Sequence, residues 1–281
     1  MEGRPLAERI RAEVAAEVRE LGTLTLATVQ VGEDEASTIY LRRKHEAAAE
    51  AGIASIDRKL PEAISEDELL ELVGELNAEE QVDGVLVQLP LPEHIDEARV
   101  IAAVDPVKDV DGFHPFNAGQ LYLGRPTHVP ATPLGIMLLL NEHRIGLDGG
   151  RAVVVGRSDI VGKPVAHLLL QANATVTVCH SHTDELARHT LDADVLVVAA
   201  GVAGIVSAEM VKAGSAVVDV GINRTEAGLA GDVDPGAAEL AAYITPVPGG
   251  VGPMTIAMLL RNTVRAARYR RGLLAFPQGR R

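Results

Sequence analysis

A lysine and a glutamine are the first residues in this chain whose types and positions suit chemistry. Lys44 lies four residues after Tyr40 in a segment with helical periodicity, so both side chains project from one face of that helix. Gln88 ends an apolar run, and ligands of open α/β sheets gather beyond the carboxyl ends of strands, so Gln88 fits a site that also holds Lys44. A partly neutral amine there can exchange protons. From spacing alone, a helix lysine is usually a solvated charge, and Gln88 is about as well explained as an edge residue.

Two aspartates lie in the segment Lys108-Asp-Val-Asp-Gly-Phe-His, within a stretch that has no periodic pattern. Asp109 and Asp111 could recognise a polar heterocycle through paired hydrogen bonds. They could equally form turns, because Asp before Gly is a common turn signal. A structureless stretch of this length is uncommon without a function.

A strand, a tight turn and a helix start follow one another from Ala152. This arrangement aims backbone N–H groups and the positive end of a helix at a phosphate. Gly156 supplies the turn and Gly162 the close helix approach, whereas Arg157 and Ser158 stand where the usual fingerprint has its middle glycine. These four residues predict a nucleotide site, and plain α/β packing explains them about as well on fold grounds.

The end of the next apolar strand, residues 175–179, favours NADP over NAD. NAD-preferring sites carry an acidic residue there, whereas this chain has His180, Ser181 and His182. Arg157 offers a fixed charge and paired donors for a 2′-phosphate. The two histidines could instead bind a metal, but they have no clear third ligand in the sequence, so we predict no metal site.

Strands and helices alternate along the first half of the chain, which predicts parallel strands covered on both faces. Ser37 is the expected cap of the second helix and Gly52 its end, and Ser65 with Glu68 forms a capping box for the third. The expected elements are a helix over 4–21, a strand over 24–31, a helix over 37–52, a strand over 54–60, a helix over 65–77 and a strand over 84–89.

The second half repeats the alternation after a long loop over 105–130. A helix is expected over 133–143, and a glycine- and proline-rich loop over 244–253 precedes a last amphipathic helix from about Thr255, which we expect to return to the first domain. The expected strands cover 152–155, 175–179, 195–199 and 216–220.

The composition limits the function classes. The chain has 281 residues, 47% of them apolar, enough for about two domains, and neither a membrane span nor a secretory signal is apparent. We therefore expect a soluble cytoplasmic protein. A net charge of -13 disfavours nucleic acid as a partner, and the single cysteine, Cys179, excludes an internal disulfide and is expected to be a small buried apolar residue.

Taken together and in this order, the motifs resemble one family closely, the bifunctional methylenetetrahydrofolate dehydrogenase/methenyltetrahydrofolate cyclohydrolases (the FolD family). The resemblance covers nearly the whole chain. The motifs are Val31-Gly32, Ser37-x-x-Tyr40-x-x-x-Lys44, Gln88-Leu-Pro-Leu-Pro92, Asp109-Val-Asp-Gly112, Thr132-Pro-x-Gly135, Gly156-Arg-Ser-x-x-Val-Gly162 and Pro246-Val-Pro-Gly-Gly-Val-Gly-Pro253.

The resemblance implies a role for each candidate residue. Lys44 would be the catalytic lysine assisted by Gln88, Asp111 would anchor the pterin, and Tyr40 would stack on the aminobenzoyl group of folate. The implied substrate contacts also include Pro248, Gly249 and Gly250, and the implied NADP contacts are Gly156, Arg157, Ser158, Gly162, His180, Ser181 and Ile222. The implied reaction oxidises 5,10-methylenetetrahydrofolate and then hydrolyses the methenyl product to 10-formyltetrahydrofolate.

The resemblance also implies two α/β domains with a cleft between them. Residues 1–134 and 255–281 would bind folate, and residues 135–254 would form a Rossmann-like, doubly wound NADP domain. A homodimer is implied as well. Two departures matter: Ala131 stands where the family often has cysteine, so no thiol chemistry is expected there, and Asp159 brings a negative charge that would weaken the NADP preference.

Two other classes of protein fit parts of the pattern. A shikimate-type dehydrogenase pairs a similar substrate lobe with an NADP lobe and would act on a small hydroxy acid. A dinucleotide-sensing protein without turnover would need the cofactor turn alone. The combination of Tyr40, Lys44, Gln88 and Asp111 favours an enzyme over a sensor, which has no use for it.

Overall fold

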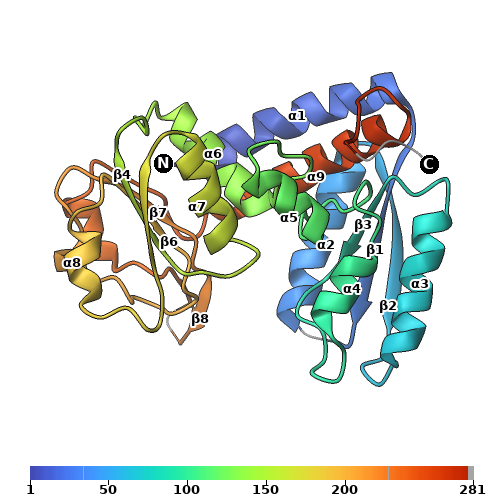
Figure 1. The fold of residues 1–281 in the computed structure, drawn as a ribbon, viewed down its shortest axis with the longest axis horizontal. Coiled ribbons are helices and arrows are strands. Elements are labelled where there is room, and N and C mark those ends of the chain that lie inside the picture. Colours follow the sequence, from blue (N-terminus) through green and yellow to red (C-terminus); the bar gives the residue numbers. More distant parts are fainter. Residues whose placement is uncertain (34, 227, 278–281) are drawn as a thin grey trace. The chain divides into compact units, whose positions relative to one another are not determined.

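The chain divides into two compact units in a computed structural model, which describes residues 1–281 except 34, 227 and 278–281, with the side chains of 35–37 also outside the description (Figure 1). We call them the three-stranded unit and the five-stranded unit after their main sheets. The three-stranded unit comprises Glu8–Val129 and Ile256–Arg281, and the five-stranded unit comprises Met1–Ala7 and Pro130–Thr255.

The three-stranded unit is built on a parallel sheet in the order β2-β1-β3. All eight residues of the central strand β1 are buried, which explains its continuous apolar run, whereas most of β2 is partly or fully exposed. Its strands are β1 (Leu24–Val31), β2 (Ile53–Leu60) and β3 (Gly84–Val87). Its helices include most of α1 (Arg4–Leu21), and α2 (Glu35–Glu50), α3 (Glu66–Ala78), α4 (Glu97–Ala103) and α5 (Pro115–Tyr122).

The starts of two helices were predicted from capping residues in the sequence, and one of these two predictions is confirmed. The predicted capping box is confirmed, since the Ser65 side chain accepts from Glu68 N and the Glu68 side chain accepts from Ser65 N. The predicted cap at Ser37 is wrong, because α2 already begins at Glu35. The Ser37 side chain lies outside the described part of the chain.

The stretch 105–130 is not the continuous loop that we predicted. It contains α5, which begins with Pro115 at its first position, where a missing N–H is harmless, and with His114 Nδ1 accepting from Phe116 N at 3.0 Å. Eight residues are too few to show a clear periodic pattern, and the same holds for α4.

The five-stranded unit has a parallel sheet in the order β10-β7-β6-β4-β5, and β8 and β9 form a separate antiparallel pair. Apolar residues from β4, β6 and β7 fill its core, and Cys179 is fully buried among them, as predicted. Its strands are β4 (Arg151–Val155), β5 (Thr175–Cys179), β6 (Val195–Val198), β7 (Ala216–Asp219), β8 (Asn223–Thr225), β9 (Gly228–Ala230) and β10 (Tyr243–Ile244). Its helical segments are α6 (Ala131–Glu142), α7 (Gly162–Gln171), α8 (Leu186–Thr190), η1 (Ala208–Met210) and η2 (Pro235–Glu239).

The last helix, α9 (Val251–Arg270), begins four residues before the predicted Thr255. Pro253 suggested a loop, but proline is tolerated in the first turn of a helix, where its missing N–H has no partner to lose. Further along α9, the buried Asn262 Nδ2 donates to the carbonyl oxygens of Val110 at 2.8 Å and Val129 at 2.9 Å. These bonds fix the helix within the three-stranded unit.

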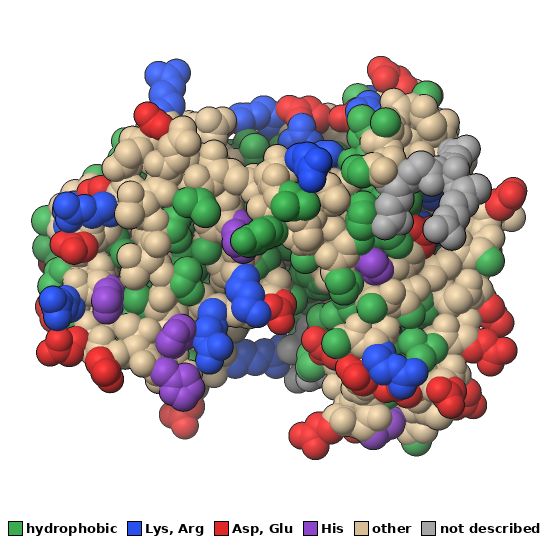
Figure 2. All heavy atoms as spheres, viewed as in Figure 1, with side chains coloured by type: hydrophobic (Ala, Val, Ile, Leu, Met, Phe, Trp, Pro, Cys, Tyr) green, Lys and Arg blue, Asp and Glu red, His purple; other side chains and the backbone are tan. Residues whose placement is uncertain are grey.

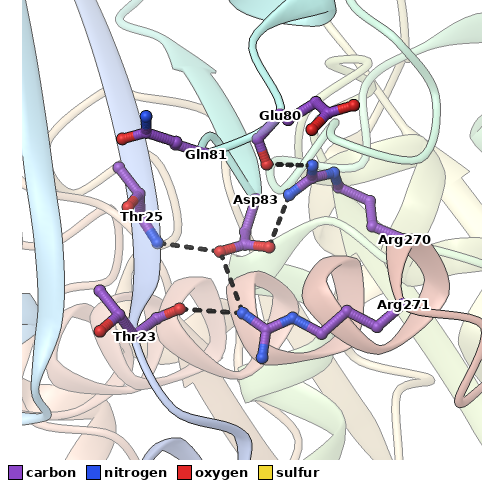
Figure 3. A pocket seen from close by; sticks show the side chains of 7 residues that line it. All are labelled: Thr23, Thr25, Glu80, Gln81, Asp83, Arg270 and Arg271. Carbon is purple, nitrogen blue, oxygen red and sulfur yellow. Dashed lines mark hydrogen bonds and ion pairs between the residues drawn. The ribbon is translucent and has the colours of Figure 1, made fainter.

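A second anchor of α9 is the buried Asp83 (Figure 3). Its carboxylate accepts from Thr25 N at 3.0 Å and from Arg270 Nη1 at 2.7 Å, and Arg271 Nη2 lies 3.8 Å from it. Arg270 also donates to the Glu80 carbonyl. A cavity of about 340 Å³ beside this cluster is lined by Thr23, Thr25, Glu80, Gln81, Asp83, Arg270 and Arg271.

The surface carries both signs of charge. On the face shown in Figure 2, acidic and basic side chains are interspersed with apolar and uncharged ones. None of the helices in the described residues combines the length and the apolar character that crossing a bilayer requires.

Candidate active site

Lys44 is buried, with 7% of its surface exposed. Its Nζ donates to Gln88 Oε1 at 3.1 Å and lies 4.9 Å from the centre of the Tyr40 ring. Both contacts follow from the fold: Tyr40 is one helical turn before Lys44, and Gln88 is the first residue after β3. The structure therefore brings together three of the four residues that the resemblance singled out in this unit.

Gln88 is oriented by its own neighbours. Its backbone N–H continues the sheet by donating to the Val29 carbonyl at 2.8 Å, and its Nε2 donates to the Leu89 carbonyl at 2.7 Å. With the amide nitrogen engaged, Oε1 is the atom that faces Lys44. This side chain is a fixed acceptor for the lysine amine.

Asp109 and Asp111 have different surroundings, which separates the two roles that the sequence left open. The Asp109 carboxylate accepts from Gly112 N at 3.0 Å, from His114 N at 2.8 Å and from Asn117 Nδ2 at 2.8 Å, so it shapes the loop. Asp111 is largely but not fully buried and interacts electrostatically with Lys44. Asp109 is thus a turn former in this structure, and the ligand-binding role of Asp111 stays a prediction.

Burial shifts both members of the Lys44 and Asp111 pair toward neutrality. Desolvation lowers the pKa of Lys44, and the attraction of Asp111 opposes this change. Desolvation raises the pKa of Asp111 to about 6, while Lys44 lowers it and Asp109 raises it. Because the ammonium form is disfavoured, the amine can take up and return a proton more readily than an exposed lysine.

The turn after β4 is packed too closely for any side chain at its two glycines. Gly156 has φ +122°, and a Cβ there would lie 2.2 Å from the Ala199 carbonyl oxygen. A Cβ at Gly162 would lie 2.3 Å from the Gly156 carbonyl oxygen. Ser158 Oγ accepts from Val161 N at 3.2 Å and from Gly162 N at 3.3 Å, so it caps α7 in this structure.

The residues predicted to select NADP lie at the same edge of the sheet. β4 and β5 are parallel with Val155 opposite Cys179, so Arg157 and His180 both follow the carboxyl ends of neighbouring strands. Arg157, His180 and Ser181 are exposed. His180 Nδ1 accepts from His182 N at 3.2 Å, and among the described residues no group of three His, Cys, Asp or Glu side chains could hold a metal.

The charge of Asp159 is balanced locally. Its carboxylate forms an ion pair with Lys163, one turn further along the chain. Both side chains are largely exposed. This pairing reduces the repulsion that Asp159 would otherwise exert on a phosphate at the turn.

The proline- and glycine-rich segment also belongs to the five-stranded unit. Gly250 is buried and donates to the Pro246 carbonyl at 2.9 Å, and the Gly249 carbonyl accepts from Gly3 N at 3.0 Å. Pro248 is exposed. Ile222 is 57% exposed, and its Cδ1 would lie 3.8 Å from a Cβ at Gly252, so the structure brings Ile222 to the start of α9.

Two family models match the chain. The model described as the tetrahydrofolate dehydrogenase/cyclohydrolase catalytic domain matches residues 1–111, and the one described as the NAD(P)-binding domain of the same family matches residues 130–271. The chain belongs to the tetrahydrofolate dehydrogenase/cyclohydrolase family. A similar curated relative, the bifunctional protein FolD of Halothermothrix orenii, is 55% identical over 276 residues, which cover 96% of this chain and 98% of the relative.

Solved structures of family members have the same fold. The bifunctional enzyme FolD from Campylobacter jejuni is 47% identical with a TM-score of 0.94, and covers 96% of this chain and 98% of its own. The Trypanosoma brucei enzyme, solved with NADP cofactor and an inhibitor, is 40% identical with a TM-score of 0.92, and covers 98% of both chains. The family membership and the predicted fold class, with its Rossmann-like domain, are thereby confirmed.

The rival reading as a shikimate-type dehydrogenase is matched at the level of fold only. Shikimate 5-dehydrogenase from Thermus thermophilus aligns over 88% of this chain and 99% of its own with a TM-score of 0.54, but at 17% identity. A likeness at this level of identity shows a shared fold and does not show a shared activity.

Sequence reasoning missed two buried aspartates near the cofactor turn, Asp219 and Asp232. A signal was present for the first, since Asp219 ends the apolar strand β7 just as Gln88 follows β3. No local pattern marks Asp232, because its partners come from distant parts of the chain.

Proposed function

We propose that Lys44 and its neighbours serve both reactions of the family to which this chain belongs: oxidation of 5,10-methylenetetrahydrofolate with NADP, and hydrolysis of the methenyl product to 10-formyltetrahydrofolate. The observation that carries this proposal is the buried amine of Lys44, bonded to Gln88 at 3.1 Å and attracted by Asp111. A lysine that serves only as a solvated surface charge would not have such a buried and bonded amine.

The five-stranded unit fits NADP at the turn after β4. The two glycines leave a cradle that a Cβ would fill, and the residues after β5 include no carboxylate before Asp184 that would repel a 2′-phosphate. NADP, when bound, supplies the acceptor for the hydride. The residues that would hold it are Gly156, Arg157, Ser158, Gly162, His180, Ser181 and Ile222.

The three-stranded unit would hold the folate. Tyr40 is placed to stack on the aminobenzoyl group and Asp111 to accept paired hydrogen bonds from the pterin, as the family resemblance implies. Pro248, Gly249 and Gly250 are proposed as further substrate contacts. Holding the two rings in a reactive arrangement is the main contribution of the protein to the oxidation.

Hydrolysis requires proton transfers that Lys44 can perform. Water adds through oxygen to the methenyl carbon, and neutral Lys44 takes one of its protons. The bond between that carbon and N5 then breaks, N5 receives the proton from Lys44, and the hydroxyl group loses its proton to solvent as the formyl carbonyl forms. Gln88 keeps the amine in place throughout, because its Oε1 accepts a hydrogen bond from Nζ.

Replacing Lys44 by Met tests the assignment. General acid–base catalysis is worth about 100-fold or more, so hydrolysis of methenyltetrahydrofolate should fall by at least about that factor. The dissociation constant of NADPH, measured by its fluorescence, should stay unchanged. Lys212→Met, at a lysine that is 40% exposed, is the matched control and should keep the normal rate. Normal hydrolysis by the Lys44→Met protein would show that the assignment is wrong.

We further propose the boundaries, assembly and location of the protein. The folate domain comprises 1–134 and 255–281 and the NADP domain 135–254. The changes of unit after residues 129 and 255 support two of these boundaries, whereas Met1–Ala7 group with the five-stranded unit. We propose a homodimer, which the family resemblance implies, and a cytoplasmic location, which the composition of the sequence led us to expect. Sedimentation at micromolar concentration should give twice the mass of one chain, and a single-chain mass would refute the dimer.

A further inference from the structure

Two carboxylates are buried at the carboxyl end of the five-stranded sheet, and the reaction proposed above does not use them. Asp219 is 4% exposed and Asp232 is completely buried. The hydrogen bonds that they accept come mainly from backbone N–H groups, with Asn223 as a side-chain donor. Burying two uncharged side chains would cost less desolvation free energy than burying two carboxylates. The carboxylates must therefore be explained by the backbone geometry that they impose.

Asp232 holds the loop that follows β6. Its Oδ2 accepts from Ala200 N at 2.7 Å and from Gly201 N at 2.8 Å, and its Oδ1 accepts from Asn223 Nδ2 at 2.8 Å. Successive backbone N–H groups of this kind form an anion-binding nest. Here the chain's own carboxylate fills the nest.

Asp219 holds the loop that follows β7. Its Oδ1 accepts from Gly221 N at 3.0 Å and from Asp232 N at 2.9 Å, and its Oδ2 accepts from Val233 N at 3.0 Å. Its backbone N–H donates to Thr245 Oγ1 at 2.8 Å. The same aspartate is thus bonded to the β7 loop, to the segment around Asp232 and to the residue before Pro246.

Each held loop adjoins a proposed cofactor contact. The Ala199 carbonyl, next to Ala200, is the atom that a Cβ at Gly156 would approach to 2.2 Å. Gly221 directly precedes Ile222, and a Cβ at Gly221 would lie 2.2 Å from Asp232 Oδ1. The loops therefore have little freedom to move independently of the two carboxylates.

We propose that Asp219 and Asp232 are positioning residues for the dinucleotide, acting through the loops after β6 and β7 that border Gly156 and carry Ile222. This inference rests on the proposed function. Because Asp232 occupies the nest at Ala200 and Gly201, a phosphate cannot bind there. The pyrophosphate would bind instead to the backbone near Arg157 and Ser158.

The two activities of one chain allow a sharp test. Asp232→Ala removes both bonds to the β6 loop, so the dissociation constant of NADPH, measured by fluorescence, should rise at least about ten-fold, or about 1.4 kcal/mol. Hydrolysis of methenyltetrahydrofolate without added dinucleotide should stay within about two-fold, since it does not need that loop. Asp232→Asn keeps one oxygen that can accept from both N–H groups and should bind NADPH within about three-fold of normal.

The matched control is Asp194→Ala. Asp194 also accepts from a backbone N–H, that of Arg151 at 2.9 Å, but at the opposite, amino end of the sheet. Its removal should leave NADPH binding unchanged. If Asp232→Ala weakens binding no more than Asp194→Ala does, or if hydrolysis falls as much as binding, the inference is overturned.

A milder variant keeps the test informative if Asp232→Ala does not fold. Asn223→Ala removes one donor to Asp232, and NADPH binding should weaken by about three-fold, with an unchanged value counting against the inference. Failure of the proposed function looks different, because the unmodified protein itself would then not bind NADPH.

Discussion

Replacing Asp111 by Asn should make the protein more stable at neutral pH while removing a residue of the proposed folate site. Burial raises the pKa of this carboxyl from 3.8 to about 6 in the folded chain. Ionised Asp111 is therefore less favourable in the folded protein than in the unfolded one, and Asn carries no charge to desolvate.

The magnitude follows from the size of the shift. A difference of about two pKa units, at about 1.36 kcal/mol each, corresponds to about 3 kcal/mol. Because the folded pKa is the higher one, this contribution to stability is fully present below the unfolded value of 3.8 and is lost as the pH rises through about 6. The wild-type protein loses this contribution to stability over this pH range, whereas the Asp111→Asn protein has no titrating group at this position.

Urea unfolding of both proteins, from about pH 4.5 to about pH 7.5, measures the effect as a difference. The free energy of unfolding of Asp111→Asn minus that of the wild type should increase with pH, mostly below about pH 6, and then level off. Dehydrogenase and hydrolase activity should both fall in the variant, since the proposed pterin anchor is lost. A difference in stability that is independent of pH, or one that decreases toward neutral pH, would refute the reasoning.

Two further substitutions probe the cofactor turn and the anchor of α9. Gly162→Ala places a Cβ 2.3 Å from the Gly156 carbonyl oxygen, so the turn must shift and NADPH should bind at least about ten-fold more weakly by fluorescence titration; unchanged affinity would contradict the proposed cradle. Asp83→Ala leaves Thr25 N and Arg270 without their buried partner and should lower the free energy of unfolding by about 3 kcal/mol in urea, whereas a loss under about 1 kcal/mol would show that this cluster does not anchor the helix.

Local signals in the sequence determined the alternation of elements and several of their ends. The capping box at Ser65 is confirmed because it depends on residues three apart in the chain. The turn glycines were identified for the same reason: Gly156 and Gly162 border one short strand–turn–helix unit. Short helices such as α5 escaped prediction because they are too brief to show a period.

Only the tertiary structure decided the chemical state and the partners of the candidate residues. A lysine in a helix is expected to be solvated, yet Lys44 is buried and its amine is bonded to Gln88, which lies 44 residues further along the chain. Asp109 and Asp111 look alike in the sequence, yet the Asp109 carboxylate is bonded to its own loop, whereas Asp111 interacts electrostatically with Lys44. Burial and partner choice depend on contacts between distant segments, and a pattern of neighbouring residues does not contain them.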